Sequence, residues 1–149
     1  MNDTSDVEHI SDFPKEVYRT FDLQLTEEQI VDYAVACGEL APCYTDPSDP
    51  DFQASPTFPS SLDGVPQFPK DFKMPSGLGM DGGRAVTQIA PIRPGVPLTG
   101  RMRLHDMYAK SGRSGRMTFV VVRLEIYDPD EKLLATTDTR IVFRERPSS

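Results

Sequence analysis

Residues 47–83 constrain the fold of this chain more than any other segment. A proline inside a helix removes a backbone hydrogen bond and clashes with the preceding turn, which costs about 3 kcal/mol. The segment therefore leaves no room for a helix longer than about two turns. Its prolines and glycines stand at positions 47, 50, 56, 59, 64, 66, 69, 75, 77, 79, 82 and 83.

The same segment is too apolar to be a solvated linker. Its aromatic and aliphatic side chains predict that residues 47–83 form an ordered connection that lies over a core or over a ligand. We call this segment the crossing. These apolar residues are Phe52, Phe58, Leu62, Val65, Phe68, Phe72, Met74, Leu78 and Met80.

A helix is predicted before this crossing. Thr26 and Gln29 have the spacing of a capping box, and Gly38 stands where helices commonly end. Residues 13–25 mix apolar and charged side chains, which indicates a lead-in strand or an arm lying on a sheet. Residues 1–12 are polar and predict a flexible tail, so that a single domain covers residues 13–146.

Strands are predicted after the crossing. Residues 85–92 form the first, and in residues 98–108 the side chains of Leu98, Met102, Leu104 and Tyr108 alternate onto one face. A glycine-rich turn at residues 110–116 leads to a strand that is apolar on both faces and therefore central, and residues 133–144 form the last strand. One helix followed by strands joined by short turns predicts an α+β fold with an antiparallel sheet.

Composition limits the functional classes. The net charge is −7, with no apolar run near the length of about 18 residues that spans a membrane, and no apolar signal core. Only two cysteines are present, which favours structural thiols in a reducing cytoplasm. An acidic chain without a basic, aromatic stripe argues against nucleic-acid binding.

The charge is unevenly distributed. Residues 1–81 carry 4 basic and 16 acidic side chains (−12), and residues 82–149 carry 12 basic and 7 acidic (+5). The basic half could meet an anionic partner such as the phosphates of coenzyme A. Alternatively, the two halves neutralise each other or the matching face of another subunit.

The end of the predicted helix and the start of the crossing resemble a known family. The resemblance rests on Tyr33-Ala34, Gly38-Glu39, Pro42, Tyr44, Asp46, Ser55-Pro56-Thr57-Phe58 and Arg93-Pro94-Gly95, in that order. This layout is similar to the MaoC-like, R-specific enoyl-thioester hydratase and dehydratase family, in which Y-A-x-x-x-G leads into D-x-N-P-x-H-x-D. The resemblance implies a hotdog fold, in which a curved antiparallel sheet surrounds a central helix. Here the prolines predict that this helix is broken or partly missing.

The resemblance departs from the family at the catalytic pair. Glu39 occupies the aspartate position and Tyr44 the histidine position, while Asp46 is kept. Glu39 and Tyr44 are therefore candidate catalytic residues at degenerate positions of the motif. Alternatively, both side chains simply close a turn. An unperturbed tyrosine has a pKa of about 10 and is a poor base. The two histidines, His9 and His105, lie outside the motif, and no metal-ligand motif is present.

The resemblance also implies a division of labour. In the family, two hotdog units pack side by side and typically one carries the Asp/His pair. This chain would then be the acyl-binding half of a heterodimer or heterotetramer whose partner bears D-x-N-P-x-H. The thioester of coenzyme A or of a carrier protein would belong to the substrate, and no further cofactor is expected. The open alternatives are a non-catalytic, homodimeric acyl-thioester-binding module, or a thioesterase that uses Asp46 or Glu39.

Candidate substrate-binding residues come from the motif, the crossing and the basic half. They are Asp46, Pro56, Thr57, Phe58, Phe68, Phe72, Arg84, Arg93, Lys110 and Arg113. Turn capping is an alternative role for Asp46, and solvated hairpin charges an alternative for the 110–116 turn. The missing helix suggests room for a bulky, steroid-like acyl group, unless the aromatic side chains fold inward and fill the space.

Overall fold

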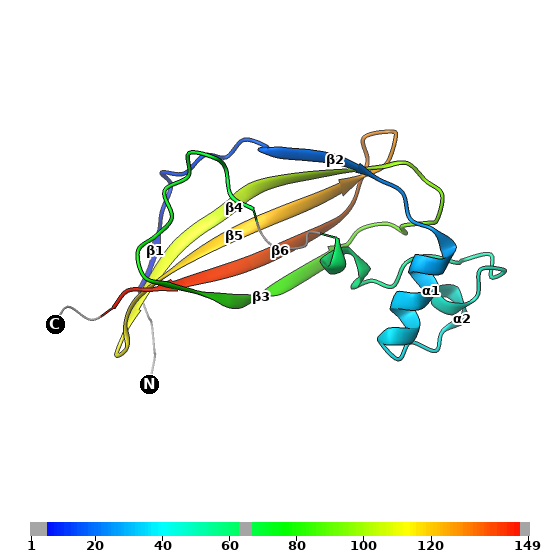
Figure 1. The fold of residues 1–149 in the computed structure, drawn as a ribbon, viewed down its shortest axis with the longest axis horizontal. Helices are drawn as coiled ribbons and strands as arrows, with labels where there is room; N and C mark the ends of the chain where they lie inside the picture. Colours follow the sequence, from blue (N-terminus) through cyan, green and yellow to red (C-terminus); the bar gives the residue numbers. More distant parts are fainter. Residues whose placement is uncertain (1–5, 63–66, 147–149) are drawn as a thin grey trace.

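The protein is described here from a computed structural model, which covers residues 6–62 and 67–146. One antiparallel sheet holds all of its strands (Figure 1), in the order β1-β4-β5-β6-β3, with β2 also paired to β4. Residues 1–5 of the expected tail and Gly64, Val65 and Pro66 of the crossing lie outside the described residues. The strands are β1 (Val7–His9), β2 (Arg19–Leu23), β3 (Leu78–Gln88), β4 (Leu98–Gly112), β5 (Gly115–Tyr127) and β6 (Leu133–Arg144).

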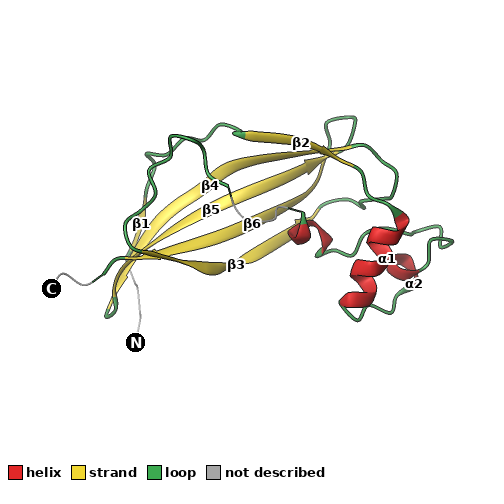
Figure 2. Cartoon of the chain, in the orientation of Figure 1, coloured by secondary structure: helices red, strands yellow, loops and turns green. Residues whose placement is uncertain are grey.

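Helices are few and lie mainly at one end of the sheet (Figure 2). α1 (Glu27–Ala36) begins at the predicted capping box, in which the Thr26 hydroxyl accepts from the Gln29 amide and the Gln29 side chain accepts from the Thr26 amide. It ends before Gly38, whose φ of 73° suits glycine. α2 (Pro42–Thr45) adds a single turn, and the only helix among the described residues of the crossing is the short 3₁₀ helix η1 (Phe58–Ser61).

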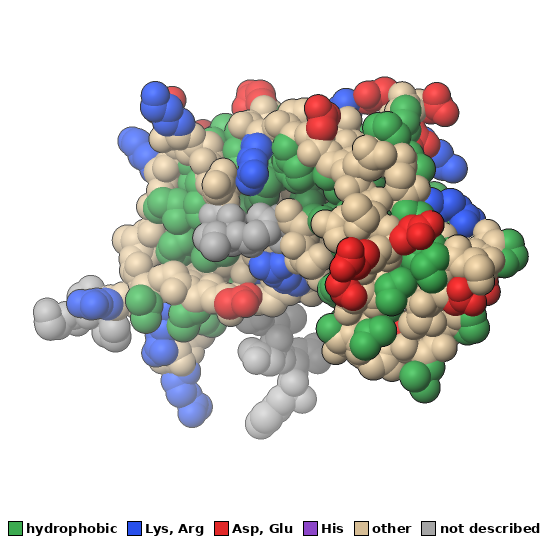
Figure 3. All heavy atoms as spheres, turned by 45° about the vertical axis from the view of Figure 1, so that its right-hand side comes forward, with side chains coloured by type: hydrophobic (Ala, Val, Ile, Leu, Met, Phe, Trp, Pro, Cys, Tyr) green, Lys and Arg blue, Asp and Glu red, His purple; other side chains and the backbone are tan. Residues whose placement is uncertain are grey.

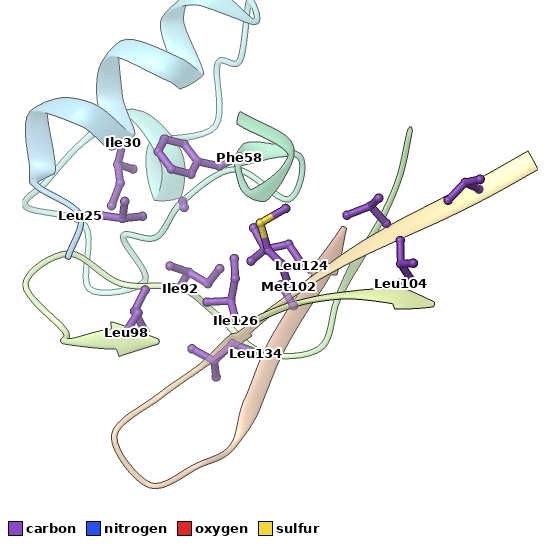
Figure 4. Close-up of a cluster of buried hydrophobic side chains, with 14 of the residues drawn as sticks. Leu25, Ile30, Phe58, Ile92, Leu98, Met102, Leu104, Leu124, Ile126 and Leu134 are labelled. Atoms are coloured by element: carbon purple, nitrogen blue, oxygen red, sulfur yellow. The ribbon is translucent and has the colours of Figure 1, made fainter. Parts of the chain in front are cut away.

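The inner face of the sheet, covered by η1 and the crossing, carries the apolar core. β5 lies between β4 and β6, which confirms its predicted central position. Figure 4 shows Leu25, Ile30 and Phe58 meeting on the side of α1 and η1. Side chains from the strands and from Ile92 complete this core: Ile92, Leu98, Met102, Leu104, Val120, Val122, Leu124, Ile126, Leu134, Ala135 and Phe143.

The outer face is held by ion pairs between neighbouring strands. Arg123 forms a two-pronged pair with Asp138 at 2.6 and 2.8 Å, and Arg103 pairs with Glu125. Glu125 is only 7% exposed as a residue, and its carboxylate also accepts from the Tyr127 hydroxyl at 2.9 Å. Charge-assisted bonds of this kind compensate a carboxylate for the loss of water.

A bulge changes the predicted faces of β4. The register shifts between Leu104 and Asp106, because His105 is an extra residue without a partner on β5. Tyr108 therefore pairs with Phe119 on the outer face, where their rings stack with centroids 4.7 Å apart. The prediction that Tyr108 shares the face of Leu104 is wrong, since strict alternation holds only up to the bulge.

A second bulge explains the error in the first predicted strand. β3 spans residues 78–88, whereas the sequence predicted residues 85–92. The glycines at 79, 82 and 83 were assigned to the crossing, but Gly82 and Gly83 form a bulge between Asp81 and Arg84, with Gly83 at φ 92°. Because the bulge adds one residue, Asp81 and Arg84 both oppose inner-face residues, Ile141 and Thr139.

The strands β1 and β2 and the β4–β5 turn can each be compared with the sequence predictions. β1 pairs with β4 through Val7 and Lys110, so the expected flexible tail contains a short paired strand. β2 pairs with the start of β4, which confirms the predicted lead-in strand. The β4–β5 turn is tighter than predicted, since Gly112 and Gly115 already pair. No helix among the described residues is both long and apolar enough to cross a membrane.

The bulge glycine provides a test of this register. We expect Gly83→Ala to lower the free energy of unfolding by about 1–2 kcal/mol, because alanine is strained at a φ of 92°. Gly112→Ala is the matched control: no atom lies within 4 Å of its added Cβ, and it should change stability by less than about 0.5 kcal/mol. Urea unfolding measures both, and equal effects would contradict the bulge.

A buried hydroxyl provides a second test. The Oγ of Ser55, a residue 4% exposed, has no hydrogen-bond partner among the described residues, whereas the Ser60 hydroxyl donates to the Thr57 carbonyl at 2.7 Å. Ser55→Ala should leave the melting temperature unchanged or raise it, because an unsatisfied hydroxyl is removed. Ser60→Ala should cost about 0.5–1.5 kcal/mol. Thermal unfolding that ranks the two variants in the opposite order would contradict this assignment.

Candidate active-site frame and acyl-binding groove

Glu39 follows directly on the end of α1 and serves as a turn cap. Its Oε1 accepts from the backbone amides of Leu40 at 3.2 Å and Ala41 at 3.5 Å. This places the carboxylate between α1 and α2, where it satisfies amides at the start of α2. A carboxylate that accepts from these two amides closes a turn.

Tyr44 lies on α2, whose first residue is Pro42. Its side chain is half-buried, and burial together with the neighbouring Cys43 and Glu39 raises the pKa of its hydroxyl above the ordinary value. The phenol is therefore neutral at pH 7 and can donate a hydrogen bond, but it cannot act as the general base that a histidine supplies.

Asp46 ends α2 and caps the next turn. Its Oδ1 accepts from the Ser48 amide at 2.9 Å and from the Ser48 hydroxyl at 2.7 Å. These hydrogen bonds lower the pKa of Asp46, so the side chain is ionised at neutral pH. The capping role considered from the sequence accounts for its position.

The Pro56-Thr57-Phe58 motif joins α1 to η1. The Tyr33 and Thr57 hydroxyls lie 2.9 Å apart, and the rings of Tyr33 and Phe58 meet edge to face at 4.9 Å. Phe58 is buried in the core, whereas Pro56 and Thr57 are exposed. The motif therefore fixes the position of α1 relative to the sheet.

Phe68 and Phe72 fill part of the space that a central helix would occupy. Their rings stack with centroids 5.6 Å apart and pack against the core, beside the N-terminal arm. The arm holds the crossing through the Tyr18 hydroxyl, which donates to the Gln67 carbonyl and whose pKa burial raises to about 12. At this side of the inner face the aromatic side chains fold inward.

A groove remains at the other side, along β3 and β6. It has a volume of about 380 Å³. Its apolar walls come mainly from Met74, Ile141 and Phe143, and its polar groups include Asp81, Arg84 and Thr139. The Arg84 guanidinium also donates to the Ser60 carbonyl at the end of η1. An apolar wall with a few polar groups suits an acyl chain that ends in a polar thioester.

The remaining candidate cations lie apart from this groove. Arg93 donates to the Pro50 and Phe52 carbonyls at 3.3 and 3.2 Å, so it holds the loop after α2. Lys110 lies over the rings of Tyr108 and Phe119 on the outer face, and Arg113 is in the β4–β5 turn. The structure therefore brings Arg84 alone of the four predicted cations to the groove.

Asp81 and Thr139 were not among the residues singled out from the sequence. The β3 bulge at Gly82-Gly83 puts Asp81 on the same face as Arg84, and Thr139 joins them from β6, where it pairs with Arg84. The histidines lie elsewhere: His9 is in β1, at the end of the sheet opposite α1 (Figure 1), and His105 is at the β4 bulge. Among residues 6–62 and 67–146, no group of three His, Cys, Asp or Glu side chains could hold a metal ion.

Comparison with known proteins identifies the fold and the family. Residues 14–137 match the family model "FAS1-like, dehydratase domain region". No curated protein sequence is significantly similar to the chain.

Several solved structures share the fold. A MaoC-like dehydratase from Phytophthora capsici is 20% identical with a TM-score of 0.65, over 89% of this chain and 48% of its own, so this chain spans about half its length. The HadBC (3R-hydroxyacyl-ACP dehydratase) complex from Mycobacterium tuberculosis is 18% identical with a TM-score of 0.60, over 91% of this chain and 93% of its own. A chain of the ChsH1-ChsH2 complex from the same organism is 16% identical with a TM-score of 0.57, over 97% of this chain and 86% of its own length.

These structures are similar to this chain in fold, and they have the curved antiparallel sheet of the hotdog fold. The sparse helix over its inner face agrees with the expectation of a broken central helix. The family model covers most of the chain. The chain belongs to the FAS1-like dehydratase-region family, among the MaoC-like hotdog dehydratases.

Proposed function

We propose that this chain is the acyl-binding subunit of an enoyl-thioester hydratase or 3-hydroxyacyl-thioester dehydratase, and that a second hotdog chain supplies the catalytic Asp/His pair. The observation that carries the proposal is the state of the catalytic positions. Glu39 caps two amides, and Tyr44 is a neutral phenol. Hydration needs a base that deprotonates water and an acid that protonates the α-carbon, and this frame offers no base with a pKa near neutrality.

A free sheet edge supports a hotdog partner. Among the described residues, β3 pairs with β6 and with no other strand, so no strand lies along its other edge. Exposed apolar side chains lie along or just after this strand: Leu78 is 65% exposed, Met80 40% and Ile89 55%. An apolar free edge is a template for another strand. The similar HadBC and ChsH1-ChsH2 structures are themselves complexes of two named chains.

The groove beside Arg84 is our candidate acyl site. Its lining includes Met80, Asp81 and Arg84 of the edge strand β3, so a partner paired along β3 would lie close to it. Phe68 and Phe72 fill the inner face near the arm, which restricts a bulky, steroid-like acyl group to this edge. Coenzyme A or a carrier protein would hold the thioester as part of the substrate, without another cofactor. The free thiols of Cys37 and Cys43 favour a reducing, cytoplasmic location. A fatty acyl thioester as substrate would place the protein in lipid metabolism.

Activity assays test the division of labour. We expect the purified chain alone to leave crotonyl-CoA and longer enoyl-CoA thioesters unhydrated, as measured by the loss of enoyl absorbance. Addition of a hotdog chain with an intact D-x-N-P-x-H motif that binds this chain should give turnover. Robust turnover by this chain alone, abolished by Glu39→Ala or Tyr44→Phe, would overturn the proposal.

Ligand binding tests the groove. We expect Met74→Asp to weaken binding of long-chain acyl-CoA about tenfold and to change binding of short-chain acyl-CoA little, because it removes apolar wall area. Val17→Asp is a matched control, since Val17 is a similarly exposed apolar residue outside the groove. Calorimetric titration of the chain with its partner measures both. Equal losses in the two variants would place the acyl chain elsewhere.

A further inference from the structure

The sheet carries a second hollow besides the groove at β3 and β6, and we call it the arm hollow. It has a volume of about 290 Å³ and lies between residues 12–14 of the N-terminal arm, residues 71–73 of the crossing and Met107 of β4. Met107 packs against the apolar core, so the arm hollow borders the inner face. The groove is lined by Ile141 and Phe143 of β6, and β5 separates β6 from β4. The two hollows therefore lie on opposite sides of β5.

The crossing separates the two hollows. Figure 1 shows it passing from the N-terminal arm to the start of β3. Phe72 and Lys73 line the arm hollow, and the next residue, Met74, lines the groove. The side chain of Phe72 is half-buried, packs against the apolar core and stacks on Phe68. An acyl chain that enters the groove and continues across the inner face would meet this ring.

The part of the crossing that carries Phe72 is held by side chains and not by the sheet. Among residues 6–62 and 67–146, residues 67–76 form no backbone hydrogen bond to a strand, and the Phe72 amide donates to the Pro69 carbonyl within the segment at 3.0 Å. The Tyr18 hydroxyl, which donates to the Gln67 carbonyl, ties the segment to the arm. Aromatic packing therefore decides how much of the inner face is closed.

The space behind Phe72 is already open. In a packed core, a large-to-small substitution leaves a cavity about as large as the atoms removed. Here, shortening Phe72 would instead join the groove to the arm hollow. The joined channel would cross the inner face from the side of β3 to the side of β4. An apolar channel of this kind takes up hydrocarbon in place of water.

We propose that Phe72 is a specificity-determining residue, whose ring ends the acyl groove and limits the length of acyl chain that the protein buries. Each methylene buried strengthens binding about fourfold, so affinity rises with chain length until the acyl chain reaches Phe72 and then levels off. This inference rests on the proposed function, because it takes the groove as the acyl site. It adds that the substrate is a thioester whose apolar part ends within the groove.

A series of saturated thioesters, from butanoyl-CoA to tetradecanoyl-CoA, tests this role. Calorimetric titration of the full chain gives the acyl length at which affinity levels off. We expect Phe72→Ala to raise this length by several carbons, with about a fourfold gain for each added methylene. Phe72→Leu should fall between the wild type and Phe72→Ala, and Phe72→Trp should lower the length. A loss of core stability alone would not move the length in opposite directions.

Phe21→Ala is the matched control. Phe21 is also a half-buried aromatic residue that packs against the core, but it lines neither hollow, so its removal should leave the levelling-off length unchanged. Circular dichroism confirms that every variant is folded. A levelling-off length that is the same in the wild type and in all Phe72 variants overturns the inference, and so does a wild type that binds none of the thioesters.

These outcomes are separate from those of the hydration assay. Partner-dependent hydration supports the proposed function even where the Phe72 variants leave the acyl length unchanged. Hydration by the protein alone would sink the proposed function and leave a length limit at Phe72 standing.

Discussion

The inner face of the sheet must be covered, and the prolines of the crossing prevent one long helix from covering it. Central strands with apolar inner faces are stable only when another layer removes them from water. Here the covering layer is assembled from separate pieces. Phe58 enters from η1, Phe68 and Phe72 from the crossing, and Phe13 and Tyr18 from the N-terminal arm. The groove beside Arg84 remains because this assembled layer is less complete than a helix.

Local signals predicted the parts of the fold that depend on local physics. The capping box at Thr26 and the glycine at 38 defined α1, and the apolar residues on both faces of β5 predicted its central position. The errors in the faces of β4 and in the start of β3 came from bulges. His105 and the Gly82-Gly83 pair each shift a strand by one residue relative to its neighbour, and this shift exists only between strands. Periodicity within one strand cannot reveal it.

The candidate site likewise has features that depend on local sequence and features that depend on the pairing of strands. Capping by Asp46 could be predicted, because an aspartate followed by a serine two residues later forms a local turn. The meeting of Asp81, Arg84 and Thr139 could not, since it depends on the β3 bulge and on the pairing of β3 with β6. The motif assigned Glu39 and Tyr44 to the two catalytic positions, but only the structure shows the surroundings of their side chains.

The uneven charge of the sequence acquires a physical meaning once the ends of the sheet are known. The helical end of the molecule, residues 26–57, forms a lobe over which Figure 3 shows acidic side chains. Seven carboxylates repel one another in the folded lobe, and this repulsion lowers stability unless other charges relieve it. Arg93, which bonds to the Pro50 and Phe52 carbonyls, is one such charge beside seven carboxylates. The cations of the β4–β5 turn, at the opposite end of the sheet (Figure 1), are too far away, because solvent and salt screen charges over such distances. Further relief must come from counterions or from another molecule.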